Sequence, residues 1–113
     1  MSSSPALPHP ERSELSLTTV LFALSDPERL AIARQLVDGP LDMAECHLSN
    51  PDIPKSTRSH LMKVLRTSGV VLNEPNGRGR RLSLRREDLD ARFPGLLDAV
   101  LSAENGEPDL TQA

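Results

Sequence analysis

The segment from Pro54 to Gly69, PKSTRSHLMKVLRTSG, constrains the fold of this chain more than any other. A proline suits the start of a helix, and a glycine just past the last turn suits the left-handed conformation that ends one. Between these two residues, apolar side chains recur at helical spacing. They are Leu61, Met62, Val64 and Leu65. The segment is therefore predicted to form a helix with one buried face.

The opposite face of this predicted helix carries cationic and polar groups and no acidic residue. Its members are Lys55, Ser56, Ser59, His60, Lys63 and Arg66. Solvated helix faces usually mix charges of both signs, whereas ammonium, guanidinium, hydroxyl and imidazole groups contact phosphates and base edges. For the helix taken alone, a solvated basic surface is the alternative interpretation.

The charges of the chain are segregated along its sequence. The 113 residues carry a net charge of −3, but the stretch from Lys55 to Arg86 contains nine basic residues and one acid, Glu74. This stretch carries +8 and the remainder carries −11. A local field attracts a polyanion more directly than the total charge does. We therefore predict a cationic surface on an acidic body.

The chain is long enough for one domain, which we place at residues 14–103 between a flexible head, 1–13, and a flexible tail, 104–113. Cys46 is the only cysteine, which excludes an internal disulfide and fits a reducing cytoplasm. No apolar run has the length of a signal peptide or a membrane span. We expect a soluble cytoplasmic protein, associated with the nucleoid when bound to DNA, with no membrane partner.

Three helical segments are predicted to precede the basic helix. Residues 14–24 are apolar around most of the helix circumference. The sequence Ser-Asp-Pro-Glu at 25–28 indicates a stop and a restart, and the second helix extends to about Val37. Residues 41–48 are predicted to form a shorter helix, and residues 49–54 form a turn rich in helix breakers. A helix, a turn and the basic helix then follow in the order of a helix-turn-helix motif.

After Gly69 the apolar period changes from that of a helix to that of a strand. Val70, Val71 and Leu72 form one apolar run, and a second run alternates through Leu82 and Leu84. Between them lies Asn-Gly at 76–77, a strong hairpin signal. Arginines surround this turn, at Arg78, Arg80 and Arg81. The pattern predicts a basic two-stranded hairpin, a short helical turn at 87–92 and an amphipathic helix at 96–101.

Two stretches resemble the ArsR/SmtB family of winged-helix repressors. FALSDPERL at 22–30 is similar to the opening signature of the family, and KSTRSHLMKVLR at 55–66 is similar to its recognition helix. The resemblance implies a mainly α (α+β) winged helix-turn-helix fold with about five helices and a two-stranded β-hairpin wing. It also implies a homodimer that binds a palindromic operator in double-stranded DNA and controls transcription. Members of the family often release the DNA when a metal ion binds to the protein.

The resemblance also assigns DNA-contacting positions. Those in the recognition helix are Lys55, Ser56, Thr57, Arg58, Ser59, His60, Lys63 and Arg66, and those in the wing are Arg78, Arg80 and Arg81. Arg58 stands where the family usually has an apolar residue, so it is either a base reader or a phosphate anchor. A solvated imidazole is the alternative interpretation of His60.

Apolar residues of the first and last helices form the expected subunit interface, with a simple core as the alternative. They are Leu15, Leu17, Val20, Leu21, Leu96, Leu97, Val100 and Leu101. A helix that is apolar nearly all round needs cover on two sides, and a domain of this size offers little cover of its own.

A metal effector finds weaker support in the sequence. The cysteine pair of the family would fall near Asp42 and Ala44, and neither is cysteine. The weak candidate ligands are His9, Asp42, Cys46 and His47, whose donor types suit nickel or zinc. A buried thiol beside a surface imidazole is the alternative interpretation of the adjacent Cys-His pair.

No motif of a nucleophilic, phosphate-binding or metalloprotease active site occurs, so we expect no enzyme. Two other functions fit the sequence. The chain could be a winged-helix module that docks a protein through its apolar helices. It could also be a DNA-binding subunit whose effector is sensed by a separate partner protein.

Overall fold

The computed structural model describes residues 7–48 and 50–103. Within these residues, five α-helices accompany a three-stranded antiparallel sheet and two short 3-10 turns. In chain order the elements are η1 (Arg12–Glu14), α1 (Leu17–Leu24), α2 (Pro27–Gln35), β1 (Leu41–Asp42), η2 (Met43–Glu45), α3 (Lys55–Thr67), β2 (Val71–Asn76), β3 (Gly79–Leu84), α4 (Arg86–Arg92) and α5 (Leu96–Ser102). The mixed, mainly helical fold with a hairpin after the basic helix is confirmed.

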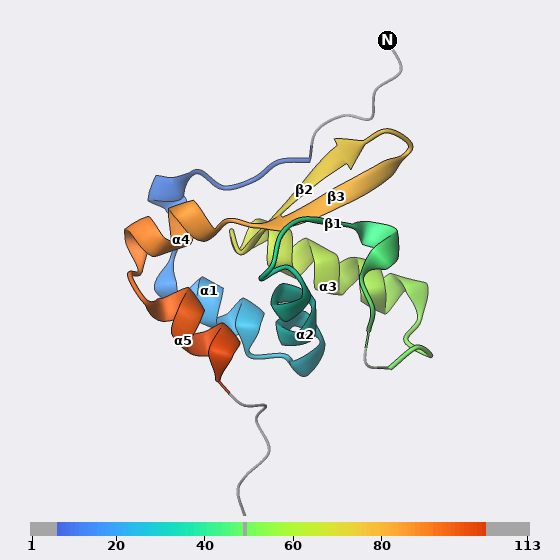
Figure 1. Cartoon of the computed structure of the whole chain (residues 1–113), viewed down its shortest axis with the longest axis horizontal. Helices are drawn as coiled ribbons and strands as arrows, with labels where there is room; N and C mark the ends of the chain where they lie inside the picture. Colours follow the sequence, from blue (N-terminus) through green and yellow to red (C-terminus); the bar gives the residue numbers. More distant parts are fainter. Residues whose placement is uncertain (1–6, 49, 104–113) are drawn as a thin grey trace, which may run out of the picture.

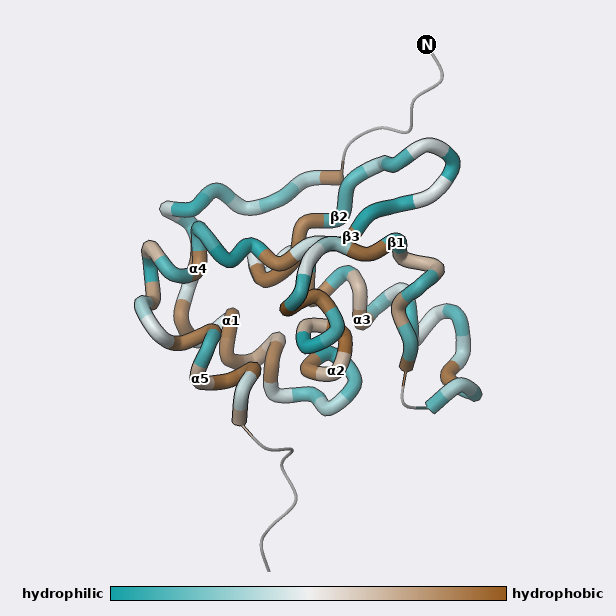
Figure 2. The backbone as a smooth tube through the Cα atoms, in the orientation of Figure 1, coloured by the Kyte–Doolittle hydropathy of each residue, from teal (hydrophilic) through white to brown (hydrophobic). Residues whose placement is uncertain are grey.

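The sheet and the helix layer enclose α3 between them (Figure 1). The strand order is β1-β3-β2, and α1, α2 and α5 lie on the side of α3 opposite the sheet. The largest fully buried side chains come from all layers and include Ile32, Leu65, Leu82, Leu89 and Leu97. Figure 2 shows the same division, with apolar segments between the layers and a hydrophilic hairpin tip. The core therefore anchors the buried face of α3.

The predicted basic helix forms α3, which buries Leu61, Met62 and Leu65. Gly69 follows it with φ of +86°, a conformation that side chains with a Cβ rarely adopt. A Cβ at this position would also lie 2.0 Å from Cδ2 of Leu15. Glycine is therefore required here both by the backbone turn and by the close packing of residue 15.

The break between α1 and α2 has the N-terminal cap that the sequence predicts. The carboxylate of Asp26 accepts hydrogen bonds from the backbone N–H groups of Glu28 and Arg29. The buried Arg29 guanidinium donates to the carbonyls of Ala23 and Phe22, at 2.7 and 3.1 Å. These carbonyls belong to the last turn of α1, so one side chain satisfies acceptors that the helix end leaves open.

The helix predicted at residues 41–48 is wrong. Leu41–Asp42 forms β1, which pairs with β3 by placing Leu41 opposite Leu82, and a 3-10 turn follows at Met43–Glu45. Pairing satisfies the otherwise open edge of β3 and covers Leu82, so the tertiary contact decides the local structure. The sheet has three strands, one more than the predicted hairpin.

The first helix begins later than predicted, at Leu17 instead of residue 14. Leu15 has an extended backbone and is 3% exposed, because its side chain packs against Gly69. Of the expected flexible head, residues 7–13 are described and contact the rest of the fold, whereas residues 1–6 lie outside the described part. The expected tail, 104–113, also lies outside it. Each helix that the structure describes is too short or too polar to span a bilayer.

Candidate nucleic-acid interface

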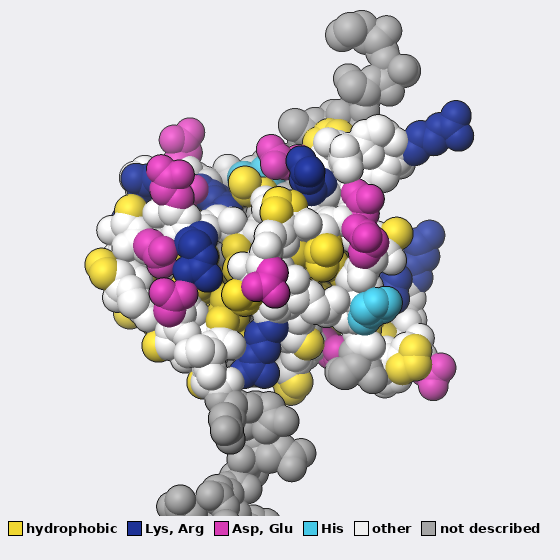
Figure 3. Space-filling model, in the orientation of Figure 1, with side chains coloured by type: hydrophobic (Ala, Val, Ile, Leu, Met, Phe, Trp, Pro, Cys, Tyr) yellow, Lys and Arg dark blue, Asp and Glu magenta, His cyan; other side chains and the backbone are white. Residues whose placement is uncertain are grey.

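The outer face of α3 is an uninterrupted polar and cationic surface. Residues 55–60 and Lys63 are exposed, while Arg66 is half-buried near the end of the helix. No ion pair among the described residues involves a basic side chain of α3. In Figure 3, cationic side chains project beside the start of α3 and at the tip of the hairpin. The charges of this helix are therefore available to an external anion.

The hairpin of β2 and β3, here called the wing, presents its arginines in different directions. The turn at Asn76-Gly77 gives Gly77 a φ of +61° and leaves Arg78 exposed at the tip. Arg80 alternates with Arg81 along β3, so their side chains lie on opposite faces of the sheet. Arg80 shares the face of Leu82, which is buried in the core, and therefore lies on the side of α3.

A buried amide holds the side chain of Arg80. Asn73 is only 5% exposed, and its Oδ1 accepts a hydrogen bond of 2.6 Å from Nε of Arg80. The backbone carbonyl of Asn73 accepts a second bond, of 2.9 Å, from a terminal nitrogen of the same guanidinium. The remaining N–H groups of Arg80 are left for other partners.

Arg81 lies in a different electrostatic environment. Its cross-strand neighbours are Asp42 on β1 and Glu74 on β2, and cross-strand partners share one face of a sheet. Two acidic residues thus share the face of Arg81, on the side away from α3. The contact of Arg81 with DNA stays a prediction, with less support from the geometry than that of Arg80.

Two other basic residues of the cationic stretch serve the fold. Arg85 is buried and forms an ion pair of 2.9 Å with Asp88, while Arg86 forms one of 2.7 Å with Asp98. Hydrogen bonds from Arg12 and then Arg85 hold the pKa of Asp88 below its ordinary value. The Arg12–Asp88 pair joins α4 to η1, and the Arg86–Asp98 pair joins it to α5. The predicted cationic surface is therefore limited to α3 and the wing.

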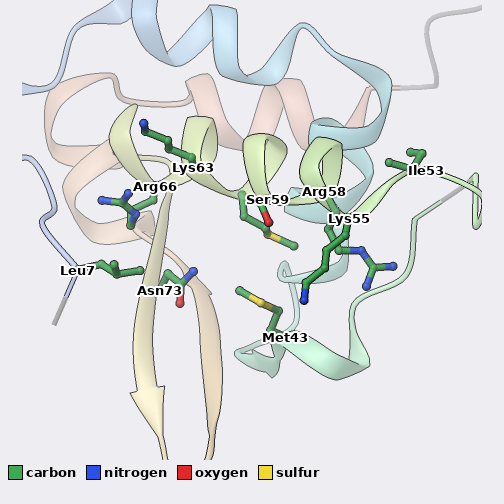
Figure 4. A pocket seen from close by; sticks show the side chains of 10 residues that line it. Leu7, Met43, Ile53, Lys55, Arg58, Ser59, Lys63, Arg66 and Asn73 are labelled. Atoms are coloured by element: carbon green, nitrogen blue, oxygen red, sulfur yellow. The ribbon is translucent and has the colours of Figure 1, made fainter. Parts of the chain in front are cut away.

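A groove of about 680 Å³ runs between α3 and the wing (Figure 4). Its basic lining consists of Lys55, Arg58, Lys63 and Arg66. Met43 and Met62 contribute apolar surface, and none of the lining residues is acidic. The positive charge of this groove is therefore not compensated by any carboxylate among its lining residues.

The N-terminal segment at residues 7–10, which sequence reasoning missed, closes one end of this groove. The side chain of Leu7 lines the groove beside Arg66 and Asn73 (Figure 4). His9 accepts a hydrogen bond of 3.0 Å at Nε2 from the backbone N–H of Asn73. Burial, followed by the nearby Arg66 guanidinium, lowers the pKa of His9. The alternation of prolines at 8 and 10 was the available signal for an extended segment.

Comparisons with known proteins agree with this geometry. The HTH-type transcriptional regulator NmtR of Mycobacterium tuberculosis is 33% identical over 100 residues, which cover 86% of this chain and 77% of that protein. The uncharacterized HTH-type transcriptional regulator YceK of Bacillus subtilis is 32% identical over 82 residues, covering 72% and 82%. A crystal structure of an ArsR family transcriptional regulator superposes with a TM-score of 0.58 and 25% identity, over 81% of this chain and 92% of the other. The chain belongs to the ArsR family of DNA-binding, winged helix-turn-helix transcriptional regulators. No family model matches it.

In this ArsR-family chain the predicted interface residues divide into two groups. Leu15, Val20, Leu97 and Leu101 are buried in the protomer core. Leu96 and Val100 are half-buried, while Leu17 and Leu21 on α1 are 45% and 42% exposed. Phe22, which the prediction omitted, is 61% exposed. Among the predicted interface residues, the exposed apolar side chains are thus those of α1, and the subunit interface itself stays a prediction.

The four weak metal candidates do not come together. Oδ1 of Asp42 accepts a hydrogen bond from the Asn76 amide, and Nε2 of His9 is bound to Asn73. Burial of the thiol raises the pKa of Cys46, and His47 is exposed. In the described ranges, no three His, Cys, Asp or Glu side chains are grouped so that they could hold a metal ion. These residues therefore do not fit a metal site there.

Proposed function

We propose that this ArsR-family regulator binds a palindromic operator as a homodimer, with α3 of each protomer in the major groove and the wing against the sugar-phosphate backbone. The observation that carries the proposal is the outer face of α3, which is exposed, cationic and free of ion pairs within the described residues. Arg80 extends this surface onto the wing.

The dimensions of the elements are compatible with this arrangement. The 13 residues of α3 correspond to a length of about 20 Å, and a major groove about 12 Å wide admits a helix. A symmetric dimer would place its two α3 helices in successive grooves, about 34–36 Å apart. Ser59 and His60 would then contact base edges, and Lys55 and Lys63 would contact phosphates.

The proposed subunit interface contains the exposed apolar residues of α1, which are Leu17, Leu21 and Phe22. Half-buried Val100 on α5 is the next candidate residue for this subunit interface. Large exposed apolar groups gathered on one helix are typical of interaction surfaces. The same surface also fits the alternative of a protein-interaction module, for which a dimer without DNA binding is the discriminating result.

Nickel or zinc as an effector is a hypothesis raised by the family resemblance, and an effector-sensing partner protein is the alternative. We assign no metal ligands, because the four candidates do not form a donor cluster. Titration of nickel or zinc into the protein–DNA complex separates the hypotheses. Only the first predicts DNA release without a second protein.

The DNA-binding proposal is tested by fluorescence anisotropy with a duplex from the region upstream of the regulated gene and with a scrambled duplex. Lys63→Ala should weaken binding to both duplexes alike, because phosphates carry no sequence information. Ser59→Ala and His60→Ala should reduce the preference for the operator by about 5- to 150-fold, since a base contact contributes about 1–3 kcal/mol.

The matched control is Arg92→Ala, which removes an exposed cation of α4 that binds the Arg12 carbonyl. It should leave both affinities unchanged. If Lys63→Ala has no more effect than this control, and if the Ser59 and His60 variants retain full discrimination, α3 is not the DNA-reading element.

A further inference from the structure

Residues 7–10, here called the N-terminal strap, lie along the outer edge of β2 and reach the end of α3 (Figures 1 and 4). Three polar contacts hold them. The carbonyl of Pro8 accepts a hydrogen bond of 2.5 Å from Arg66, His9 accepts one from Asn73, and the carbonyl of Pro10 accepts one of 2.6 Å from Arg85. Leu7 adds an apolar contact at the end of the groove.

The strap completes an open strand edge. β2 is the last strand of the sheet, so the N–H groups on its outer side have no strand partner. The Asn73 N–H points outward and binds Nε2 of His9. Pro75 has the same orientation two residues later and has no N–H. His9 must be neutral at Nε2 to accept this bond, which agrees with a pKa lowered first by burial and then by Arg66.

The strap also touches the cations of the proposed DNA surface without neutralising them. A carbonyl bound to Arg66 leaves the guanidinium charge intact and, within the described residues, takes up one of its five N–H donors. Arg80 is held in the same manner by Asn73, and Asn73 is the residue whose backbone His9 binds. One short segment thus orients Arg66 on α3 directly and holds the backbone of Asn73, the residue that orients Arg80.

We propose that the N-terminal strap is a positioning element of the DNA-binding surface, holding Arg66 and, through Asn73, Arg80 in place before DNA arrives. Ordering a long side chain on binding opposes affinity, and a side chain that is already ordered avoids this cost. The proposal rests on the proposed function, because it assumes that these arginines face phosphates. It assigns a role to residues that neither the recognition helix nor the wing contains.

The direct test replaces residues 7–10 by four glycines and compares operator affinity with the wild type by fluorescence anisotropy. The matched control replaces residues 2–5 by glycine, which keeps the chain length and the terminal charge. The strap variant should bind at least about fivefold more weakly, as expected for two side chains that must be ordered on binding. The control should bind like the wild type, and thermal unfolding should show both variants folded.

A second pair of variants tests the contact itself. Gln at position 9 offers an oxygen that can accept the Asn73 N–H, whereas Ala offers none. His9→Gln should therefore retain most of the affinity that His9→Ala loses. In an Arg66→Ala background the strap replacement should have a smaller effect than in the wild type, because contacting residues are not additive.

Four outcomes would overturn the proposal. Tighter binding by the strap variant would mean that the segment covers the DNA surface. An undiminished effect in the Arg66→Ala background, together with an inactive His9→Gln variant, would mean that the strap acts on the fold alone. A wild type that binds no operator would refute the proposed function as well, which distinguishes that failure from a wild type that binds and does not depend on the strap.

Discussion

At the scale of single residues, neighbouring side chains of the same type have different roles. Arg80 and Arg81 are adjacent in the sequence, but Arg80 is held by Asn73 on the α3 side of the sheet, and Arg81 lies between Asp42 and Glu74 on the other side. Arg85 is buried in an ion pair. Composition alone does not distinguish these arginines. The alternation of side chains along β3 places Arg80 and Arg81 on opposite faces of the sheet.

Gly69 gives a prediction at the same scale. Gly69→Ala should lower the free energy of unfolding by about 2–4 kcal/mol, because a Cβ is strained at positive φ and overlaps the Leu15 side chain. Urea denaturation followed by circular dichroism measures this loss. Gly79→Ala is the control, since its Cβ would meet only the Asn76 carbonyl at 3.8 Å. Equal stability of the two variants would contradict the assigned packing.

At the scale of elements, the structure depends on segments that are weak on their own. β1 has two residues and η1 has three, and both are stabilised by partners distant in the sequence. η1 is joined to α4 by the Arg12–Asp88 ion pair of 2.7 Å, and β1 adds to the edge of β3. α1 is an ordinary helix, but it leaves two leucines and Phe22 exposed. The protomer therefore holds its short elements by tertiary contacts and leaves α1 partly uncovered.

The exposed face of α1 predicts that acidic substitutions on this helix dissociate the proposed dimer. Leu17→Glu combined with Leu21→Glu should convert the proposed dimer to a monomer, because unpaired carboxylates are costly in an apolar interface. The monomer should stay folded, since neither residue is buried in the protomer core and both are nearly half exposed. Sedimentation velocity measures the mass, and circular dichroism measures the fold.

Val37→Glu is the control for this change, because Val37 is 43% exposed but lies beyond the end of α2. It should leave the dimer intact. If Val37→Glu dissociates the dimer and the α1 variant does not, the subunit interface is on another surface.

At the scale of the whole molecule, the basic residues available for DNA contact are separated from those that form ion pairs within the fold. The basic residues of α3 and the wing tip remain unpaired by carboxylates in the described part, whereas Arg12, Arg85 and Arg86 are paired with acids of α4 and α5. The total charge of −3 conceals this arrangement. A polyanion meets the local cationic surface, and the acidic remainder limits other contacts with nucleic acid.

This distribution predicts a steep dependence of DNA affinity on salt. With about 6–10 phosphate contacts per dimer, affinity should fall by about 10³–10⁵ between 50 and 200 mM salt because counterions are released. Anisotropy titrations over a range of salt concentrations measure the slope. Arg78→Ala should make the slope shallower by about one for each protomer if Arg78 contacts a phosphate. A slope near zero would contradict the electrostatic basis of the proposed interface.

The sequence by itself determined the elements whose signals are local. The periodicity and closing glycine of α3, the Asp-Pro start of α2 and the Asn-Gly turn of the wing are each indicated by residues within a few positions of one another, and all are present. The family resemblance and the cationic residues of α3 could also be recognised from short stretches of sequence. Local signals were enough to place the candidate surface.

Only the tertiary structure decided the features that depend on partners distant in the chain. The strand at residues 41–42, predicted as helix, pairs with a segment about 40 residues later. The bonds of His9 with Asn73 and of Arg85 with Pro10 join residues 64 and 75 positions apart. Such contacts leave no periodic trace in the sequence, because they depend on which distant segments the whole fold brings together and on the loop-closure cost of doing so.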